Sequence, residues 1–270
     1  MADSTRYDPC LIAFWLLGSV VIVITVLALL SIAVPELSDL SHLASVAAET
    51  GVIEAIAVTI AAACVAVLFL VIFCTPLAYV LARTTSRWKG VVENLVDIPL
   101  VLPHTVAGLM VYLLFMSRGP IGSPFYRVGI IFEDAFLGIV VAMIFVSSPY
   151  YINAVREGFE KVPVHLENVA RMLGATRFHA FRSITLPLST RHILSGSFLA
   201  WGRAVGEFAA VVMIAYFPMV ASTFIYNRFT TGGLAESRSV AFIMILICIA
   251  VFVLFRWAAR TAGRSGHDRT

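Results

Sequence analysis

Long apolar runs, most of them without a single charged side chain, limit what this chain can fold into. Six of them occur along its 270 residues, and they span residues 11–34, 55–82, 98–117, 135–155, 193–217 and 239–255. A helix of about 20 apolar residues crosses the hydrocarbon core of a bilayer, which is about 30 Å thick. The runs therefore predict an all-α fold, a polytopic membrane bundle with about six transmembrane helices.

The overall composition agrees with placing these runs in lipid. Apolar residues make up 60% of the chain and charged residues 13%, and the mean hydropathy is +0.94. An average soluble domain is about half apolar and about a quarter charged. A soluble fold of this size could therefore not bury all the apolar surface of this chain. The run at 11–34 is longer than the apolar part of a signal peptide and lacks a clear cleavage site, so we expect it to be retained as a span.

Lysine and arginine residues divide unequally between the two sides that six spans create. Of the 19 such residues, Arg203 lies inside a run and only four fall on the side opposite both termini: Arg118, Arg127, Arg228 and Arg238. Loops rich in these residues stay in the cytoplasm. We therefore predict a multi-pass protein of the cell membrane, in contact with membrane lipid, whose two termini are cytoplasmic.

Proline and glycine interrupt several runs in a way that suits the lining of a pathway. A proline removes a backbone hydrogen bond, which a membrane helix tolerates only where neighbouring groups or water satisfy the freed carbonyl. Gly202 and Gly206 form a GxxxG pair, which predicts close approach of another helix. The interrupting prolines are Pro76, Pro99, Pro103 and Pro149.

The segment 157–188, on the lysine- and arginine-rich side, is patterned as two short helices. Pro163 suits the start of the first helix and Gly174 its end, and a second helix is expected after Thr176, before Pro187 closes the segment. Helices this short are unstable alone in water, so their apolar face favours a groove on a partner protein. The same face is equally compatible with packing on the membrane surface or on the chain's own spans. It is formed by Leu166, Val169, Ala170 and Leu173.

The spacing within this segment resembles a motif of the permeases of binding-protein-dependent, ATP-driven importers. That motif reads Glu-Ala-Ala, three residues, Gly, nine residues, Ile, one residue, Leu-Pro. Asn168 stands where the family has its glutamate, and Glu167 lies one position earlier. The residues of this chain at the motif positions are Asn168, Val169, Ala170, Gly174, Ile184, Leu186 and Pro187.

The resemblance covers residues from about 50 to the last run and is greatest to permeases for molybdate, tungstate and, more distantly, sulfate. The similar segments are 75–79, 97–108, 202–208 and 226–234. It implies that the segment 157–188 is a cytoplasmic coupling-helix loop that seats in a cleft of an ATPase subunit. The residues implied to act in this coupling are Glu167, Asn168, Val169, Ala170, Gly174, Ile184, Leu186 and Pro187.

The resemblance also implies the partners and the function. We expect the transmembrane permease subunit of an importer for a tetrahedral oxyanion, either molybdate or tungstate, with sulfate or thiosulfate as the alternative. Its partners would be cytoplasmic ATPase subunits, which bind the ATP and Mg²⁺, and an extracytoplasmic oxyanion-binding protein; no nucleic acid is expected. Because one bundle of six helices offers little room for an enclosed path, we expect a homodimer.

No signature of an enzyme or of a bound cofactor is present. The chain has no Gly-Lys pair, so it cannot form the phosphate-binding loop of an ATPase, and it has no HExxH or GxSxG segment. Its four cysteines form no CxxC pair, which gives no support to a metal site. A membrane enzyme is therefore disfavoured, and a secondary transporter without an ATPase remains the alternative class.

Arg203 and Glu207 are the only charged residues well inside a run. At positions i and i+4 they share one helix face, and pairing lowers the cost of placing either charge in a membrane. Arg203 could bind the oxyanion, but Glu207 would cancel the field that an anion needs, so we favour a structural ion pair. His104 either lines the path or donates to a carbonyl that the nearby prolines leave free.

We divide the chain into three parts on these grounds. Residues 1–50 would form an N-terminal tail, the first span and an external loop, and residues 51–260 the core permease domain with five spans. Residues 261–270 would form a cytoplasmic tail.

Overall fold

The computed structural model describes the backbone of residues 9–264 and the side chains of residues 10–255 and Trp257. Every regular element in this part of the chain is helical, as predicted. The elements are α1 (Pro9–Ser38), α2 (Leu40–Ala47), α3 (Thr50–Arg83), α4 (Lys89–Val101), α5 (His104–Phe115), α6 (Gly122–Arg127), α7 (Phe136–Glu160), α8 (Val164–Met172), α9 (Arg177–Ala180), η2 (Phe181–Thr185, a π-helix), α10 (Leu186–Leu188), α11 (Thr190–Val205), α12 (Ala209–Ile214), α13 (Ala221–Gly232) and α14 (Leu234–Arg264).

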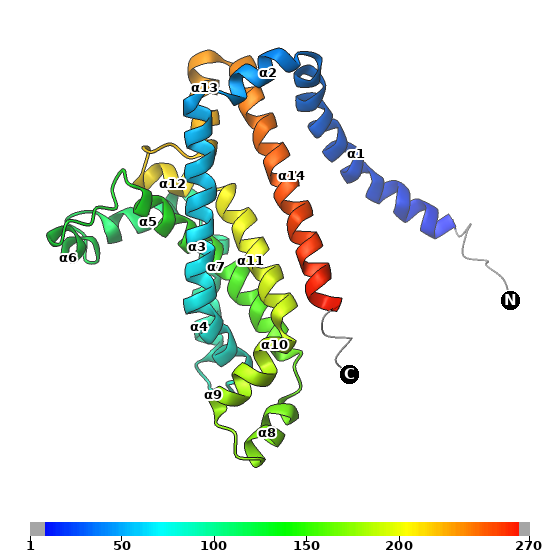
Figure 1. Ribbon diagram of the computed structural model, residues 1–270, viewed down its shortest axis with the longest axis vertical. Helices are drawn as coiled ribbons and strands as arrows, with labels where there is room; N and C mark the ends of the chain where they lie inside the picture. The colour runs from blue at the N-terminus through cyan, green and yellow to red at the C-terminus, as the bar shows by residue number, and fades with distance from the viewer. Residues whose placement is uncertain (1–8, 265–270) are drawn as a thin grey trace.

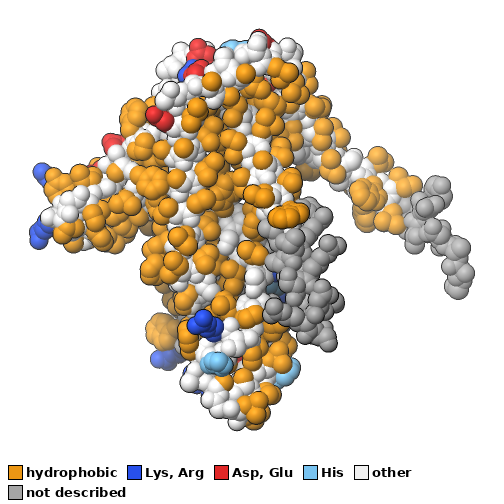
Figure 2. All heavy atoms as spheres, in the orientation of Figure 1, with side chains coloured by type: hydrophobic (Ala, Val, Ile, Leu, Met, Phe, Trp, Pro, Cys, Tyr) orange, Lys and Arg blue, Asp and Glu red, His pale blue; other side chains and the backbone are white. Residues whose placement is uncertain are grey.

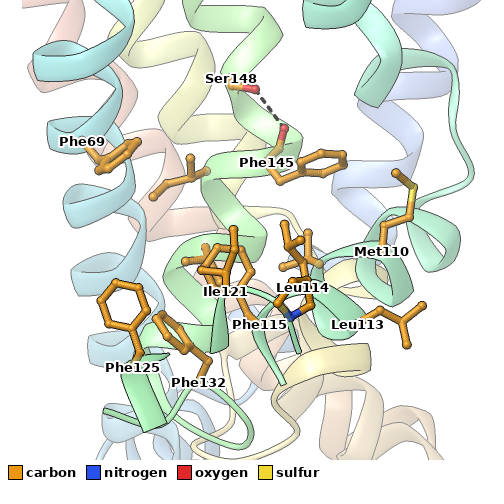
Figure 3. A pocket seen from close by; sticks show the side chains of 14 residues that line it. Phe69, Met110, Leu113, Leu114, Phe115, Ile121, Phe125, Phe132, Phe145 and Ser148 are labelled. Atoms are coloured by element: carbon orange, nitrogen blue, oxygen red, sulfur yellow. Dashed lines mark hydrogen bonds between the residues drawn. The ribbon is translucent and has the colours of Figure 1, made fainter. Parts of the chain in front are cut away.

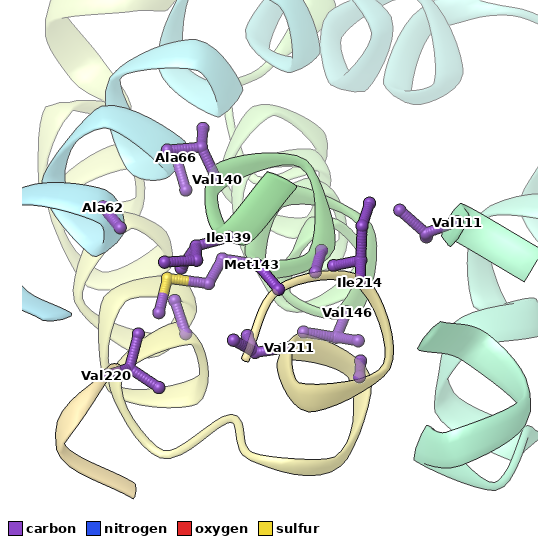
Figure 4. Close-up of a cluster of buried hydrophobic side chains, with 14 of the residues drawn as sticks. Ala62, Ala66, Val111, Ile139, Val140, Met143, Val146, Val211, Ile214 and Val220 are labelled. Atoms are coloured by element: carbon purple, nitrogen blue, oxygen red, sulfur yellow. The ribbon is translucent and has the colours of Figure 1, made fainter. Parts of the chain in front are cut away.

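Helix α7 is the most buried long helix of the bundle and packs against both α3 and α11 (Figure 1). The α3 side of this contact is built from small side chains, among them Ala62 and Ala66, which let the two backbones approach closely. Ile139 and Met143 of α7 fill the space opposite them (Figure 4). The alanine-rich face of α3 therefore fixes the centre of the fold.

Apolar side chains cover the middle of the visible face, and charged ones gather near its ends (Figure 2). Many large apolar side chains of the long helices are exposed, including Phe73 of α3 and Leu254 of α14. A soluble protein rarely exposes so large a continuous apolar surface. The distribution is that of a protein whose middle faces lipid, in agreement with the predicted membrane bundle.

Four helices are long and apolar enough to cross a membrane, namely α1, α3, α7 and α14. They contain the runs predicted at 11–34, 55–82 and 239–255 and nearly all of the run at 135–155. Each observed helix is longer than the run that predicted it, because the polar residues at the run ends continue the helix. Residues 1–8 of the predicted N-terminal part and residues 265–270 of the predicted cytoplasmic tail lie outside the described residues.

The run predicted at 98–117 is not one straight helix. It is divided between α4 and α5, which meet at a bend of 113°. Leu102 and Pro103 form the break, since a proline and the residue before it disfavour continuation of a helix. If this bent pair is one span, the described chain has five candidate spans rather than the expected six.

Gly108 allows α5 to lie directly on α12. A Cβ atom at this position would come within 2.7 Å of the Cα and carbonyl oxygen of Ala210 and within 2.8 Å of Met213 Cβ. Backbone atoms cannot move aside as a flexible side chain can, so only glycine permits this approach.

The run predicted at 193–217 is also interrupted. Helix α11 ends at Val205, which makes it 16 residues long, and the chain continues into the short helix α12 from Ala209. The expected close approach of a helix at Gly202 and Gly206 does not occur among the residues that the structure describes: a Cβ on Gly202 would have no neighbour within 4 Å, and one on Gly206 would meet only the carbonyl oxygen of Gly202. This face of α11 is open.

Helix α1 lies apart from the vertical helices and joins them at the end where α2 and α13 lie (Figure 1). None of the most apolar stretch of α1 is buried. Ion pairs hold this end of the molecule together: Arg238 Nε of α14 lies 2.6 Å from Glu36 Oε1 of α1, and Arg228 of α13 pairs with Glu49 beside α3.

Candidate functional site

The segment that carries the motif forms a compact unit at the end of the bundle opposite α2 and α13 (Figure 1). We call this unit, residues 161–189, the α8–α10 loop. It contains α8, α9, η2 and α10, and Ser189 leads directly into α11. The predicted helix start at Pro163 and the predicted second helix after Thr176 are both observed, because Pro163 precedes α8 and the Thr176 hydroxyl accepts the amide of His179 at the start of α9.

Glu167 fastens α8 to the end of α3. Its Oε1 accepts hydrogen bonds from Arg83 Nη2 at 2.7 Å, from Arg83 Nε at 2.9 Å and from the Thr185 hydroxyl at 2.6 Å. Its Oε2 accepts from the Tyr79 hydroxyl at 2.8 Å. Arg83 also donates to the Val162 carbonyl at 3.0 Å. One buried carboxylate thus joins α8 to η2 within the loop and to the end of α3, which is more distant in sequence.

The same contacts keep Glu167 ionised. Burial alone would raise the pKa of its carboxyl, but hydrogen bonds from Thr185, Tyr79 and Arg83 and the charge of Arg83 outweigh burial, so the pKa lies below its ordinary value of 4.5. A charged, fully hydrogen-bonded carboxylate is a strong structural tie.

Gly174 ends α8 in a conformation that favours glycine. Its φ is +94°, and no atom lies within 4 Å of the position that a Cβ would occupy. The Ala175 amide donates to the Ala170 carbonyl and the Gly174 amide to the Arg171 carbonyl, both at 3.0 Å, which is the hydrogen-bond pattern of a Schellman motif. A larger residue here would be strained by the backbone, not by a clash.

The tip of the α8–α10 loop presents apolar side chains to the outside. Met172 is 79% exposed, Leu173 85% and Phe178 70%. Phe181, by contrast, packs in the interior against Tyr79 of α3 and Phe159 of α7. Phe178 and Phe181 therefore do not share one face, although both follow Thr176 in the second helix.

The other motif residues are distributed between the surface and the interior of the loop. Asn168, Val169 and Pro187 are exposed, whereas Ala170, Ile184 and Leu186 are half-buried. Val169 and Leu173, two of the four residues of the predicted apolar face, are thus not covered by the chain's own helices.

Arg203, Glu207 and His104 lie together where α11 breaks. Arg203 Nη2 lies 2.5 Å from Glu207 Oε2 and 2.9 Å from His104 Nε2 at the start of α5. Glu207 Oε1 accepts the amide of Ala210 in the first turn of α12 at 2.7 Å. The Glu207 side chain is 2% exposed and that of Arg203 17%. This arrangement ties the end of α11 to both α5 and α12, and it also leaves part of His104 at the surface.

A cavity of about 950 Å³ lies between α3, α5, α6 and α7 (Figure 3). Its lining is apolar, with rings such as Phe69, Phe125 and Phe145. Ser148 is its one lining side chain with a polar group, and the Ser148 hydroxyl donates to the Phe145 carbonyl. Such a lining offers nothing to a doubly charged anion, so this cavity is not suited to an oxyanion path.

Residues 74–264 match the protein family described as the binding-protein-dependent transport system inner membrane component. This match covers more than half of the chain. The chain belongs to this family. It is therefore a membrane-spanning transport component, and the resemblance inferred from the loop spacing is confirmed.

Individual relatives agree with this membership. This transport component is 38% identical over 252 residues to the molybdate/tungstate transport system permease protein WtpB of Thermococcus kodakarensis, which covers 93% of the chain and 97% of that protein. It is 33% identical over 213 residues to the molybdenum transport system permease protein ModB of Escherichia coli K12, which covers 77% and 93%.

A solved structure supports the fold. The crystal structure of a bacterial alginate ABC transporter, in complex with an alginate pentasaccharide-bound periplasmic protein, contains a chain that matches with a TM-score of 0.67. The match covers 94% of this transport component and 96% of that chain, at 19% sequence identity. At this identity, the likeness concerns the fold alone.

Three residues of the site were missed by the sequence analysis. Arg83, Tyr79 and Thr185 surround Glu167, but nothing in their local sequence marks them as its partners. The only available signal was the acidic residue itself, since a glutamate beside a short amphipathic helix needs a partner if it is buried.

Proposed function

We propose that this chain is the permease subunit of an importer for molybdate or tungstate, powered by a separate ATPase. The observation that carries the proposal is its similarity to two relatives named for molybdate/tungstate or molybdenum transport, one of them along nearly its whole length. The α8–α10 loop supports the proposal, because it is fixed to the bundle by Glu167 and exposes an apolar tip that a partner protein could bind.

In this proposal the tip seats on an ATPase subunit, which binds the ATP and Mg²⁺. Met172, Leu173 and Phe178 would enter an apolar groove of the ATPase, as short amphipathic helices commonly do. Movement of the ATPase would then pass through α8 to α3, since Glu167 and Arg83 join the two helices. A binding protein outside the cell would deliver the oxyanion, and selectivity among oxyanions would rest largely with it.

We further infer that the permease is a homodimer. The open face at Gly202 and Gly206 supports this, because a helix of a second copy can approach a face without side chains more closely than any other. Arg203, which directly follows Gly202, contacts His104. A path between two copies would also explain why the cavity within one copy is apolar.

The proposal takes the α8–α10 loop to be cytoplasmic, and cysteine labelling tests this orientation. We expect an impermeant thiol reagent to label Ser41→Cys and Gly232→Cys in intact cells, but not Arg87→Cys or Thr176→Cys. The four native cysteines are replaced by serine first. Labelling of Thr176→Cys in intact cells would show that the orientation is reversed.

Replacing Gly174 tests the docking itself. Leucine at a φ of +94° should cost about 1–2 kcal/mol of backbone strain and unwind the end of α8. We expect Gly174→Leu to lose most of the ATPase that co-purifies with the tagged wild-type chain and to lose ATP-dependent molybdate uptake in vesicles.

Gly129→Leu is the matched control. Gly129 follows α6 with the same pair of hydrogen bonds as Gly174, a φ of +84° and equally open surroundings, but α6 lies away from the α8–α10 loop (Figure 1). This variant should retain the ATPase. If Gly174→Leu retained both the ATPase and uptake, or if no ATPase co-purified with the wild-type chain, the proposed function would have to be abandoned.

A further inference from the structure

A second cavity, of about 820 Å³, lies on the bundle side of the α8–α10 loop. Its walls are the end of α3, the start of α4 and one face of α8, and it differs from the apolar cavity in its polar lining. The α8 residues that line it are Val164, Glu167, Asn168 and Arg171. The exposed tip residues Met172 and Leu173 do not line it, so α8 has one face for the cavity and another for the tip.

The cavity carries an excess of positive charge. Four of its lining side chains are basic, and Glu167 is its only acidic one: the basic residues are Arg83, Lys89, Arg171 and Arg177. Both oxygens of Glu167 are already occupied by Arg83, Tyr79 and Thr185. The Lys89 ammonium lies 3.5 Å from Glu160 and 3.8 Å from Glu93.

Arg171 and Arg177 are the uncompensated charges. Both are exposed, and neither forms an ion pair or hydrogen bond through its side chain with any residue that the structure describes. Thr85 and Asn168 add hydrogen-bonding groups to the same wall. Two guanidinium groups beside amide and hydroxyl groups form a recognition surface for phosphate oxygens.

The position of the cavity indicates where such a phosphate would come from. Thr84, in its wall, directly follows the last residue of the long apolar helix α3. Trp88 follows four residues later and is 61% exposed, with the Arg87 guanidinium 5.7 Å from its ring. An exposed tryptophan at the end of a span marks the headgroup level of a bilayer. The cavity therefore lies at the height of lipid phosphates.

We propose that this cavity binds the phosphate of an anionic phospholipid from the adjoining leaflet. The headgroup would bridge Arg171 of α8 and Arg177 of α9 to the end of α3, and would thereby brace the loop against the bundle alongside the Glu167 contacts. The proposal requires that this end of the bundle lies at a membrane surface and that an ATPase leaves the cavity open, and it is independent of the transported substrate.

Quenching of Trp88 fluorescence by brominated lipid tests the proposal. The full-length chain, with Trp15, Trp201 and Trp257 replaced by phenylalanine, is reconstituted into vesicles of phosphatidylcholine containing either brominated phosphatidylglycerol or brominated phosphatidylcholine. We expect Trp88 to be quenched at about 25-fold lower mole fraction of the brominated phosphatidylglycerol, since each of the two arginines contributes about a factor of five near anionic lipid.

Double variants test whether the preference for phosphatidylglycerol depends on the two arginines of the cavity. Arg171→Gln with Arg177→Gln should abolish the preference for phosphatidylglycerol, while Arg171→Lys with Arg177→Lys should keep it. Arg182→Gln with Arg191→Gln is the matched control, because it removes two exposed arginines at the same end of the molecule but outside the cavity, and it should also keep the preference.

Four results would overturn the proposal. The first is equal quenching of the wild-type chain by both lipids, and the second is an equal loss of preference in the control pair. The third is abolition of the preference by millimolar inorganic phosphate, which would assign the cavity to a free anion. The fourth is loss of the preference when the ATPase is bound, which would show that an ATPase surface fills the cavity.

Discussion

Replacing Glu167 by alanine is expected to release the α8–α10 loop from the bundle. The change removes the acceptor of three side chains and leaves Arg83, whose side chain is 14% exposed, without its carboxylate partner. Breaking one half of a buried ion pair costs about 3–5 kcal/mol. We expect a large fall in the amount of ATPase that co-purifies, together with rapid cleavage between α8 and α11 in limited proteolysis of the purified chain.

Further variants and the pH dependence distinguish loss of the Glu167 contacts from a general loss of folding. Glu167→Gln removes the negative charge but keeps an oxygen that can accept from Arg83 and Thr185, so it should fall between wild type and alanine. Glu160→Ala, an exposed neighbour near the same end, should behave as wild type. Because the Glu167 pKa is lowered by folding, its stabilisation is present above pH 4.5 and is lost as the pH falls below that value. Protection of the loop in Glu167→Ala equal to that of wild type at neutral pH would disprove the role.

The second large effect is expected at Arg203 and Glu207. Each single alanine variant leaves one charge unpaired in a low-dielectric interior, at a cost of about 3–5 kcal/mol, whereas the double variant leaves none. We expect each single variant to reduce the amount of folded protein in the membrane sharply and the double variant to recover much of it. Fluorescence-detected size-exclusion chromatography of the solubilised membranes gives this amount.

Oxyanion uptake by the same membranes distinguishes the two roles of Arg203. If the pair is structural, uptake per folded molecule in the double variant should stay near the wild-type value. His104→Gln, which changes the third member without leaving an unpaired charge, should fold normally. An Arg203→Ala protein that folds fully but takes up no anion would make Arg203 a residue of the path.

The sequence predicted the long helices well and the broken ones poorly. Helices α3, α7 and α14 follow from their apolar runs, because length and hydropathy alone decide whether such a run spans a bilayer. The prolines at 99 and 103 indicated an interruption before α5, but the bend of 113° depends on how α5 packs on α12. The sequence at the break after α11 contains no proline. At this break the Glu207 carboxylate accepts a hydrogen bond from the Ala210 amide, and the helix does not continue.

The site was predicted in outline from one local pattern. The spacing from Asn168 to Pro187 is contiguous, so the helix start, the turn at Gly174 and the second helix could be placed without knowing the rest of the fold. The partners of Glu167 could not, because Arg83 lies 84 residues away and its approach depends on the packing of α3. The role of each motif residue in coupling stays a prediction.

The ion pair between Glu36 and Arg238 also bears on how the chain is made. Its two members are 202 residues apart. Helix α1 therefore leaves the ribosome long before Arg238, its partner in α14, has been synthesised. Throughout that interval α1 has to reside in the bilayer without this ion pair. Its candidate span, Cys10–Ser38, is 29 residues long and its most apolar 18-residue stretch has a mean hydropathy of 2.8, so α1 is stable there by itself. Synthesis of α14, the last helix in the described part of the chain, then joins α1 to the bundle.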